Sequence, residues 1–280
     1  MNALIVGAGR IGLATGALLR SAGFGVAYFD IDPDVRGELG DAGERVVAGP
    51  SEESFDLIAV CVPTATVEGE MSTAALRQAL STCAAFLQPG AFTAVAVRST
   101  LLPGTMAAVV VPRLTELATS SDWAACHWPS FSRERLAVED EQAPRLVCIG
   151  SDGDERLRTV LDPIFASLGA DPLWTDCATA ELIKHGSNLF NATKISYFNA
   201  LNAWASAAGV DGQKVANAVA LAAEGAWNPS YGTSVGAPFG GACLPKDLEA
   251  FLGYLRSGEL PFAGFVEAVK AVNDSFGRVL

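Results

Sequence analysis

A cysteine at the start of a predicted helix is the residue of this sequence best placed for covalent chemistry. Cys243 follows Gly240 and Gly241 and precedes Leu-Pro-Lys-Asp, a pattern that predicts a glycine turn leading into a helix N-terminus. There the helix dipole and Lys246 would favour the thiolate, which is the nucleophilic form of cysteine. The other five cysteines lie in apolar runs and are predicted to be small core residues.

A lysine and an asparagine lie one turn apart on a long helix predicted from about residue 178 to residue 208. Lys184 and Asn188 share one polar stripe, because residues at i and i+4 lie on the same helix face. A lysine among apolar neighbours is a natural proton acceptor or electrostatic clamp, so we predict a catalytic role for this pair. Farther along the stripe, Asn199 and Asn202 are predicted to satisfy each other or nearby backbone.

A glycine-rich turn near the N-terminus predicts a dinucleotide site. The G-x-G-x-x-G motif of residues 7–12 lies between a strand pattern at residues 3–6 and a helical pattern at residues 11–21. Glycines there allow the backbone to approach a pyrophosphate, whose charge the helix N-terminus stabilises. Asp30 closes the next strand pattern, where its carboxylate would bind ribose hydroxyls and repel a 2′-phosphate, which favours NAD over NADP. The predicted NAD-binding residues of this part are Gly7, Gly9, Arg10, Ile11, Gly12 and Asp30.

Further strand patterns at residues 57–62, 92–97 and 146–149 place more polar groups near this site. Ligands of a parallel sheet bind at the carboxyl ends of its strands, and two of these strand ends carry hydroxyl groups. The alternative is that the hydroxyls cap helices. The predicted cofactor-binding residues at these two ends are Val62, Pro63, Thr64, Ser99 and Thr100.

The alternation of strand and helix patterns indicates βαβ units, and the pattern changes near residue 152. We therefore predict an α/β fold, with a Rossmann-like doubly wound parallel sheet over residues 1–152 that binds NAD. Residues 153–280 show no convincing strand pattern and are predicted to form an all-α domain. Its helices are expected at residues 154–168, 178–208, 212–223, 247–255 and from 262 to the end.

Composition excludes several classes of protein. Nineteen basic against 31 acidic residues leave a net charge of −12, the wrong sign for nonspecific nucleic-acid binding. No apolar run is long enough for a membrane span, and no leader or C-x-x-C pair is visible, so we expect a cytoplasmic protein with reduced thiols. Without metal-ligand spacing, no metal is predicted, and His127 and His185 are expected to be packing or surface residues. Any anion would be held by a few groups such as Arg98, Lys184 and Lys246.

Four segments together resemble the UDP-glucose/GDP-mannose 6-dehydrogenase family. The last of them is highly specific, and the Arg-Ser-Thr-x-x-Pro-Gly-Thr form of the second favours the GDP-mannose branch. The resemblance implies a Rossmann-like domain followed by a helical domain like that of 6-phosphogluconate dehydrogenase, and oxidation of a primary alcohol of a nucleotide sugar to a carboxylate with two NAD⁺. The segments are residues 7–12 with Asp30, residues 97–105, residues 180–196 and residues 239–247.

The resemblance also implies roles for individual residues. Cys243 would capture the aldehyde as a thiohemiacetal, become a thioester and be freed by water. Lys184 and Asn188 would hold and polarise the substrate oxygen, and Asp247 would orient Lys184. Thr100 and Glu134 would position or activate the hydrolytic water. The family further implies a homodimer formed through the long helix, although ordinary burial within the domain would also account for the apolar faces of that helix.

Departures from the family pattern predict a changed substrate. The chain ends 34 residues after Lys246, where the family continues into a second Rossmann-like domain, so we expect a truncated member that lacks that domain. Ser130 stands where the family has the first of two acids, and Ser230 stands where it has an arginine that reaches the neighbouring subunit's site. The expected substrate is thus a sugar, sugar nucleotide or nucleoside-like alcohol, with UDP-glucose and GDP-mannose turned over poorly.

Two other functions stay open at this point. One is a two-electron dehydrogenase resembling the alcohol, β-hydroxyacid and 6-phosphogluconate enzymes, of which the last two share the helix-borne lysine and asparagine but lack the cysteine. The other is a noncatalytic NAD-binding dimeric paralogue. The joint presence of Cys243, Lys184, Asn188 and Asp247 argues against the second, because an inactive site has no physical reason to keep a nucleophile and a lysine.

Overall fold

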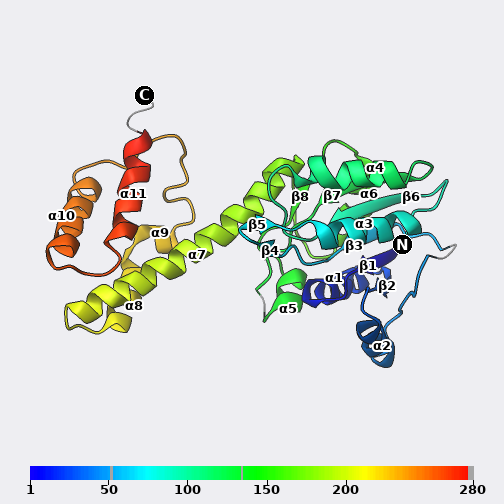
Figure 1. The fold of residues 1–280 in the computed structure, drawn as a ribbon, viewed down its shortest axis with the longest axis horizontal. Coiled ribbons are helices and arrows are strands. Elements are labelled where there is room, and N and C mark those ends of the chain that lie inside the picture. Colours follow the sequence, from blue (N-terminus) through cyan, green and yellow to red (C-terminus); the bar gives the residue numbers. More distant parts are fainter. Residues whose placement is uncertain (51–52, 134, 277–280) are drawn as a thin grey trace. The chain divides into compact units, whose positions relative to one another are not determined.

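A computed structural model describes residues 1–50, 53–133 and 135–276 (Figure 1). The chain divides into two compact units, Met1–Asn188 and Leu189–Leu280. Each unit has its own core and is described separately below.

A seven-stranded sheet with the order β2-β1-β3-β6-β7-β8-β9 forms the centre of the first unit. The first five strands in this order run parallel, as predicted. Only β8 pairs antiparallel to its neighbour β7, through His127 and Gly150, and β9 then runs parallel to β8. The strands are β1 (Asn2–Val6), β2 (Gly25–Phe29), β3 (Leu57–Val60), β6 (Phe92–Val97), β7 (Asp122–His127), β8 (Cys148–Gly150) and β9 (Leu173–Thr175).

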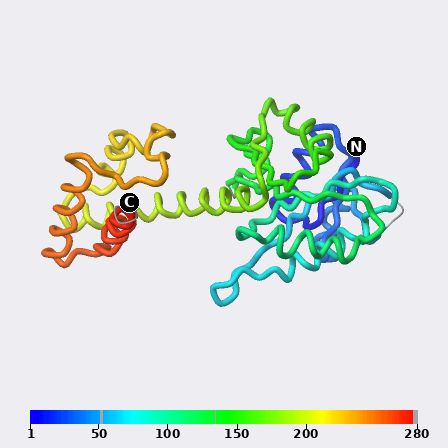
Figure 2. Tube along the Cα trace, turned by 90° about the horizontal axis from the view of Figure 1, so that it is seen from above, coloured from blue at the N-terminus to red at the C-terminus, as the bar shows by residue number. Residues whose placement is uncertain are grey.

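Helices cover both faces of this sheet, which explains why its central strands are apolar throughout. Successive residues of β1 alternate between two cores: Ala3 and Ile5 pack on one face, Leu4 and Val6 on the other. Helices α1 (Arg10–Ser21) and α6 (Arg156–Ala166) pack into the first core, whereas α3 (Ala74–Phe86) and α4 (Val111–Leu117) pack into the second. The remaining elements are α2 (Pro33–Asp41), a π-helical turn (Met106–Val110), α5 (Ala137–Gln142) and the hairpin of β4 (Thr66–Val67) and β5 (Glu70–Met71), which stands out from the first unit (cyan in Figure 2).

Two strands of the sheet differ from the sequence prediction. Strand β7 was not predicted, because its sequence Asp-Trp-Ala-Ala-Cys-His mixes polar and apolar residues. Strand β9 lies in the region predicted to be free of strands, so that prediction is wrong. It has three residues, and its pairing with β8 at the sheet edge depends on a distant partner.

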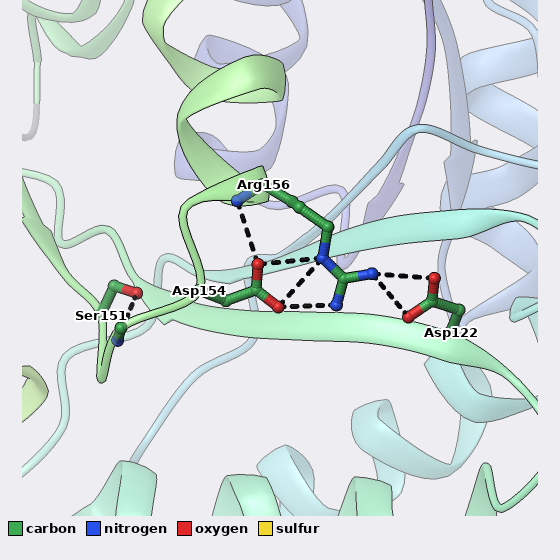
Figure 3. A network of polar contacts seen from close by, with 5 residues as sticks. Asp122, Ser151, Asp154 and Arg156 are labelled. Atoms are coloured by element: carbon green, nitrogen blue, oxygen red, sulfur yellow. Dashed lines mark hydrogen bonds and ion pairs between the residues drawn. The ribbon is translucent and has the colours of Figure 1, made fainter.

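Helix α6 also belongs to the first unit, which ends at Asn188 and therefore extends well past the boundary predicted after residue 152. At the start of α6, the guanidinium of Arg156 lies between Asp154, at 2.7 Å, and Asp122 of β7, at 2.8 Å (Figure 3). The same guanidinium stacks 4.3 Å from the ring centroid of Phe92 in β6. The half-exposed ion pairs stabilise the fold only weakly, yet they fix the start of α6 against the sheet.

Among the described residues of the second unit, all regular elements are helices, as predicted for this part of the chain. Helix α7 (Cys177–Ala207) starts in the first unit, continues into the second and ends before Gly209, whose φ of +72° suits a glycine. The other helices are α8 (Gly212–Ala222), α9 (Glu224–Trp227), α10 (Leu244–Ser257) and α11 (Ala263–Phe276). A small core joins α7, α10 and α11 and is made of Ala200, Trp204, Leu252, Leu255 and Val266. Within the described residues, no helix is both long enough and apolar enough to cross a membrane.

Candidate active site

The three glycines of the turn after β1 have three different environments. Gly7 has a φ of +96°, and a Cβ there would lie 2.6 Å from the carbonyl oxygen of Cys61. A Cβ on Gly12 would lie 2.0 Å from the carbonyl oxygen of Gly7, so that α1 approaches the turn as closely as a glycine allows. Gly9, in contrast, faces open space. Two glycines are therefore required by packing, and the third leaves room beside the first amides of α1, where a pyrophosphate would bind.

Asp30 lies directly beside this turn. Its Oδ2 accepts a hydrogen bond from the backbone amide of Ala8, at 2.7 Å, and its Oδ1 accepts one from the amide of Asp32, at 3.0 Å. The carboxylate thus lies at the end of β2 next to the glycine turn, which is the position expected for a ligand of the adenosine ribose. The open space at Gly9 and the carboxylate of Asp30 are the features that an NAD molecule would need here.

The ends of β3 and β6 are held together by hydroxyl groups. The Ser99 hydroxyl accepts from the amide of Val62, at 3.2 Å, and donates to the Val62 carbonyl, at 2.6 Å. The Thr64 hydroxyl donates to the carbonyl oxygen of Thr100, at 2.8 Å. These hydroxyls link two loops rather than cap helices. The sheet order changes direction between β1 and β3, so the structure brings the predicted cofactor residues of the first unit to the switch point where dinucleotides bind.

Lys184 and Asn188 contact each other on successive turns of α7. The Lys184 Nζ donates to the Asn188 Oδ1 at 3.2 Å and lies 5.4 Å from the ring centroid of Phe131. Burial lowers the pKa of Lys184, while the Glu141 carboxylate raises this pKa and Arg98 lowers it. A half-buried ammonium with a lowered pKa suits a group that accepts or shares a proton near neutral pH.

Glu181 fixes the start of α7 to the loop after β6, a role that sequence reasoning missed. Its fully buried carboxylate accepts hydrogen bonds from the amides of Gly104, at 2.5 Å, and Met106, at 2.7 Å. Burial raises the pKa of Glu181, and the two amides oppose this effect. Lys184 lies one turn farther along α7, so this contact also sets the position of Lys184 relative to the sheet.

A buried ion pair beside this site was also missed. The Arg98 Nη2 lies 2.6 Å from the Glu141 Oε2, and the two side chains are 0% and 8% exposed. The Arg98 guanidinium stacks 4.0 Å from the ring centroid of Trp128, and its Nε and Nη1 have no hydrogen-bond partner among the described residues. The segment Glu-Asp-Glu in α5 gives no signal that its last member, and not the first, is buried.

Cys243 lies in the second unit, just before the first turn of α10, and its side chain is exposed. Before it, Gly241 has a φ of +82°, and the Asn273 side chain of α11 accepts from the Phe239 amide at 2.6 Å, which holds the glycine turn. Lys246 and Asp247 form an ion pair with each other in the same unit. Glu134 lies outside the described residues.

The remaining cysteines are core residues, as predicted. Four are buried and Cys61 is partly exposed; none forms a disulfide. Burial raises the pKa of Cys61 and of Cys177 to about 12, so these thiols stay protonated at neutral pH.

A cavity of about 710 Å³ opens between the loop after β7, α5 and α7. Its walls include Trp128, Phe131, Arg145 and Ile183. None of the predicted site residues that the structure describes lines this cavity, so it is adjacent to the candidate site and not the site itself.

The burial of His127 leads us to expect that the stability of the fold depends on pH. Burial lowers its pKa from 6.5 to about 4, although its Nε2–H donates to the Ser99 carbonyl at 3.2 Å. Above pH 6.5 the His127 imidazole is neutral in the folded and in the unfolded protein. Between pH 6.5 and about 4, only the unfolded chain takes up the proton. We expect the free energy of unfolding to fall as the pH drops from 6.5 to about 4, by roughly 3 kcal/mol in total.

Urea denaturation between about pH 7 and about pH 4 measures this loss. The matched variant is His127→Gln, whose side-chain amide can donate to the same Ser99 carbonyl without titrating. It should remove most of this pH dependence. An equal slope in both proteins would assign the acid sensitivity to other groups.

Comparisons with known proteins place two family models on the chain. The model of the NAD binding domain of the UDP-glucose/GDP-mannose dehydrogenase family matches residues 47–168, and the model of the central domain of the same family matches residues 178–275. The glycine turn after β1 precedes both matched segments, and its nucleotide-binding geometry is given by the structure.

Individual proteins agree with these models. The chain is 38% identical over 170 residues to the GDP-mannose 6-dehydrogenase of Pseudomonas syringae pv. syringae, a match covering 59% of this chain and 38% of that protein. It is 29% identical over 308 residues to the UDP-glucose 6-dehydrogenase of Rhizobium meliloti, covering 100% of this chain and 69% of that protein. The match thus spans well under half the length of the first relative.

A solved structure extends the likeness to the fold of nearly the whole chain. A ternary complex of GDP-mannose dehydrogenase from Pseudomonas aeruginosa superimposes with a TM-score of 0.87 at 24% identity. The superposition covers 98% of this chain and 69% of that one. It supports the order of a Rossmann-like unit followed by a helical unit.

Proposed function

Because the chain belongs to the UDP-glucose/GDP-mannose dehydrogenase family, we propose that it is an NAD-dependent oxidoreductase acting on a primary alcohol. The substrate class is a sugar, sugar nucleotide or nucleoside-like alcohol, and the product is the carboxylate. The observation that carries this proposal is the contact of the half-buried Lys184 with Asn188, in the same compact unit as an intact dinucleotide-binding turn. When bound, NAD⁺ would supply the hydride acceptor, one molecule for each of the two oxidation steps.

Residues of the chain would carry out the proton transfer, the binding of the substrate oxygen and the covalent step. Lys184 accepts the proton of the substrate hydroxyl, and Asn188 holds the oxygen on which charge develops. The Cys243 sulfur then adds to the aldehyde carbon, giving a thiohemiacetal that the second oxidation converts to a thioester. Water attacks this thioester, which releases the carboxylate and restores the thiol.

Supporting residues are assigned by the resemblance to the family. Thr100 and Glu134 position the hydrolytic water, and Asp247 orients Lys184 in this proposal. Gly7 to Gly12, Asp30 and the loops at residues 62–64 and 99–100 hold the dinucleotide, with Lys246 contributing a positive charge.

We also propose a homodimer formed through α7. The large apolar side chains of Leu189, Phe190 and Ile195 are each more than 60% exposed in the single chain, which is the surface that a second copy would cover. Sedimentation equilibrium should therefore give twice the mass of the chain, and Phe190→Glu should give the monomer mass. A wild-type protein that sediments as a monomer would exclude this assembly.

NADH production tests the proposed activity. We expect two NADH per alcohol oxidised when purified protein is screened with NAD⁺ against sugar nucleotides, sugar phosphates and nucleosides, with UDP-glucose and GDP-mannose included. One NADH per alcohol would indicate a two-electron dehydrogenase. Stoichiometric NAD binding without NADH formation from any of these substrates, and without labelling of Cys243 by iodoacetamide, would indicate a noncatalytic NAD-binding protein.

A further inference from the structure

One carboxylate holds the loop that lies beneath Lys184. The Glu141 Oε1 accepts hydrogen bonds from the hydroxyls of Ser130, at 2.6 Å, and Ser132, at 2.7 Å. The residue between these serines is Phe131, whose ring centroid lies 5.4 Å from the Lys184 Nζ. Glu141 thus fixes both neighbours of the ring on which the ammonium rests, within the first unit.

The second oxygen of the same carboxylate balances a buried positive charge. The Glu141 Oε2 pairs with Arg98, whose guanidinium stacks on Trp128 at the start of the same loop. Arg98 therefore anchors the loop to β6, and Glu141 anchors it to α5. Although burial opposes ionisation, Arg98 and the two serine hydroxyls lower the pKa of Glu141, so this group is a carboxylate at neutral pH.

The two charged groups that act on the pKa of Lys184 oppose each other. Arg98 lowers the pKa of Lys184, whereas Glu141 raises it. His127 and His185 lie close enough to interact with each other, and Lys184 and Arg98 both disfavour a charge on His127. Among the described residues, Glu141 is the carboxylate whose charge supports the Lys184 ammonium.

We propose that Glu141 is a positioning residue of the candidate active site, delivering a carboxylate from α5 that clamps residues 130–132 and sets the place and charge of Lys184. This inference rests on the proposed function for its catalytic meaning. Glu141 brings a carboxylate to Ser130 from a different element of the fold. It acts on catalysis through Phe131 and Lys184.

Lysine NMR tests the inference without any substrate. The chain has five lysines, so reductive methylation with ¹³C-formaldehyde gives few signals, and Lys184→Arg assigns the one of interest. In the wild type, the Lys184 methyl signals should be shifted upfield by the Phe131 ring. Glu141→Gln should lower the pKa of Lys184, whereas Glu139→Gln, which removes an exposed charge from the same helix, should leave it unchanged.

A second variant covers the case in which Glu141→Gln does not fold because Arg98 loses its counter-charge. The double variant Ser130→Ala with Ser132→Ala keeps the ion pair and removes the clamp. Its Lys184 signals should lose the upfield shift. Unchanged Lys184 signals in the double variant, or an equal Lys184 pKa in Glu141→Gln and Glu139→Gln, would overturn the inference.

Turnover separates this inference from the proposed function. With an alcohol identified by the NADH screen, the double serine variant should lower kcat roughly tenfold or more while leaving KM for NAD⁺ within about twofold. An unaltered kcat overturns the positioning role even if the protein is an active dehydrogenase. No NADH from any alcohol overturns the proposed function, whereas the NMR result still decides whether the clamp sets Lys184.

Discussion

Replacing Cys243 by serine is expected to lower carboxylate formation by about a thousandfold or more, because a serine hydroxyl without an adjacent base does not replace a thiolate nucleophile. The first oxidation does not need the sulfur, so the variant should release aldehyde or stall after about one NADH per alcohol. Counting NADH in a single turnover, together with aldehyde trapping by a hydrazine, measures both effects.

A core cysteine provides the control for this result. Cys148 is buried in β8 and distant in sequence from the glycine turn at residues 240–241, so Cys148→Ala should retain both oxidation steps. Iodoacetamide should inactivate the wild type by labelling Cys243, the exposed thiol, ahead of the buried ones. Two NADH per alcohol from Cys243→Ser would contradict the proposed thioester route and favour direct hydride transfer from the hydrated aldehyde.

Replacing Gly12 by alanine is expected to destabilise the first unit by several kcal/mol, a large part of the stability of an ordinary domain. The added Cβ would lie 2.0 Å from the Gly7 carbonyl oxygen and 3.2 Å from the Ile5 side chain. The first of these contacts is with the backbone directly after β1, so it is relieved only by moving α1 away from the turn. Thermal unfolding and the soluble yield measure this loss.

Gly9 provides the matched variant, because an alanine there meets nothing within 4 Å and its φ of −69° suits any residue. Gly9→Ala should keep the melting temperature of the wild type but weaken NAD⁺ binding roughly tenfold or more, since the methyl group occupies space beside the pyrophosphate. Isothermal titration calorimetry measures this affinity. Equal NAD⁺ affinity in Gly9→Ala and wild type would place the dinucleotide elsewhere.

Short-range patterns predicted most of the fold and part of the site. The glycine turn, the strand patterns on either side of it and the long helix with Lys184 and Asn188 follow from spacings of a few residues. A helix places residues i and i+4 together whatever surrounds it, so the contact between this lysine and asparagine was predictable. The apolar runs of the central strands were equally clear, because both faces of a parallel sheet are covered.

Long-range contacts account for what the sequence did not predict. Strand β9 is three residues long and exists because β8 lies beside it, and α6 belongs to the first unit because it packs on the sheet. Cys243 was recognisable as a motif, and its place in the reaction is a proposal for the experiments above.

The sequence by itself determined the dinucleotide turn, the helical pair Lys184 and Asn188 and the family to which the chain belongs, since each depends on residues that are neighbours along the chain or one turn apart. Only the tertiary structure decided that Glu141 is buried against Arg98 and the serines beside Phe131. The physical reason is that the burial of a charged side chain is set by distant elements, here β6 and the loop after β7, that supply its partners.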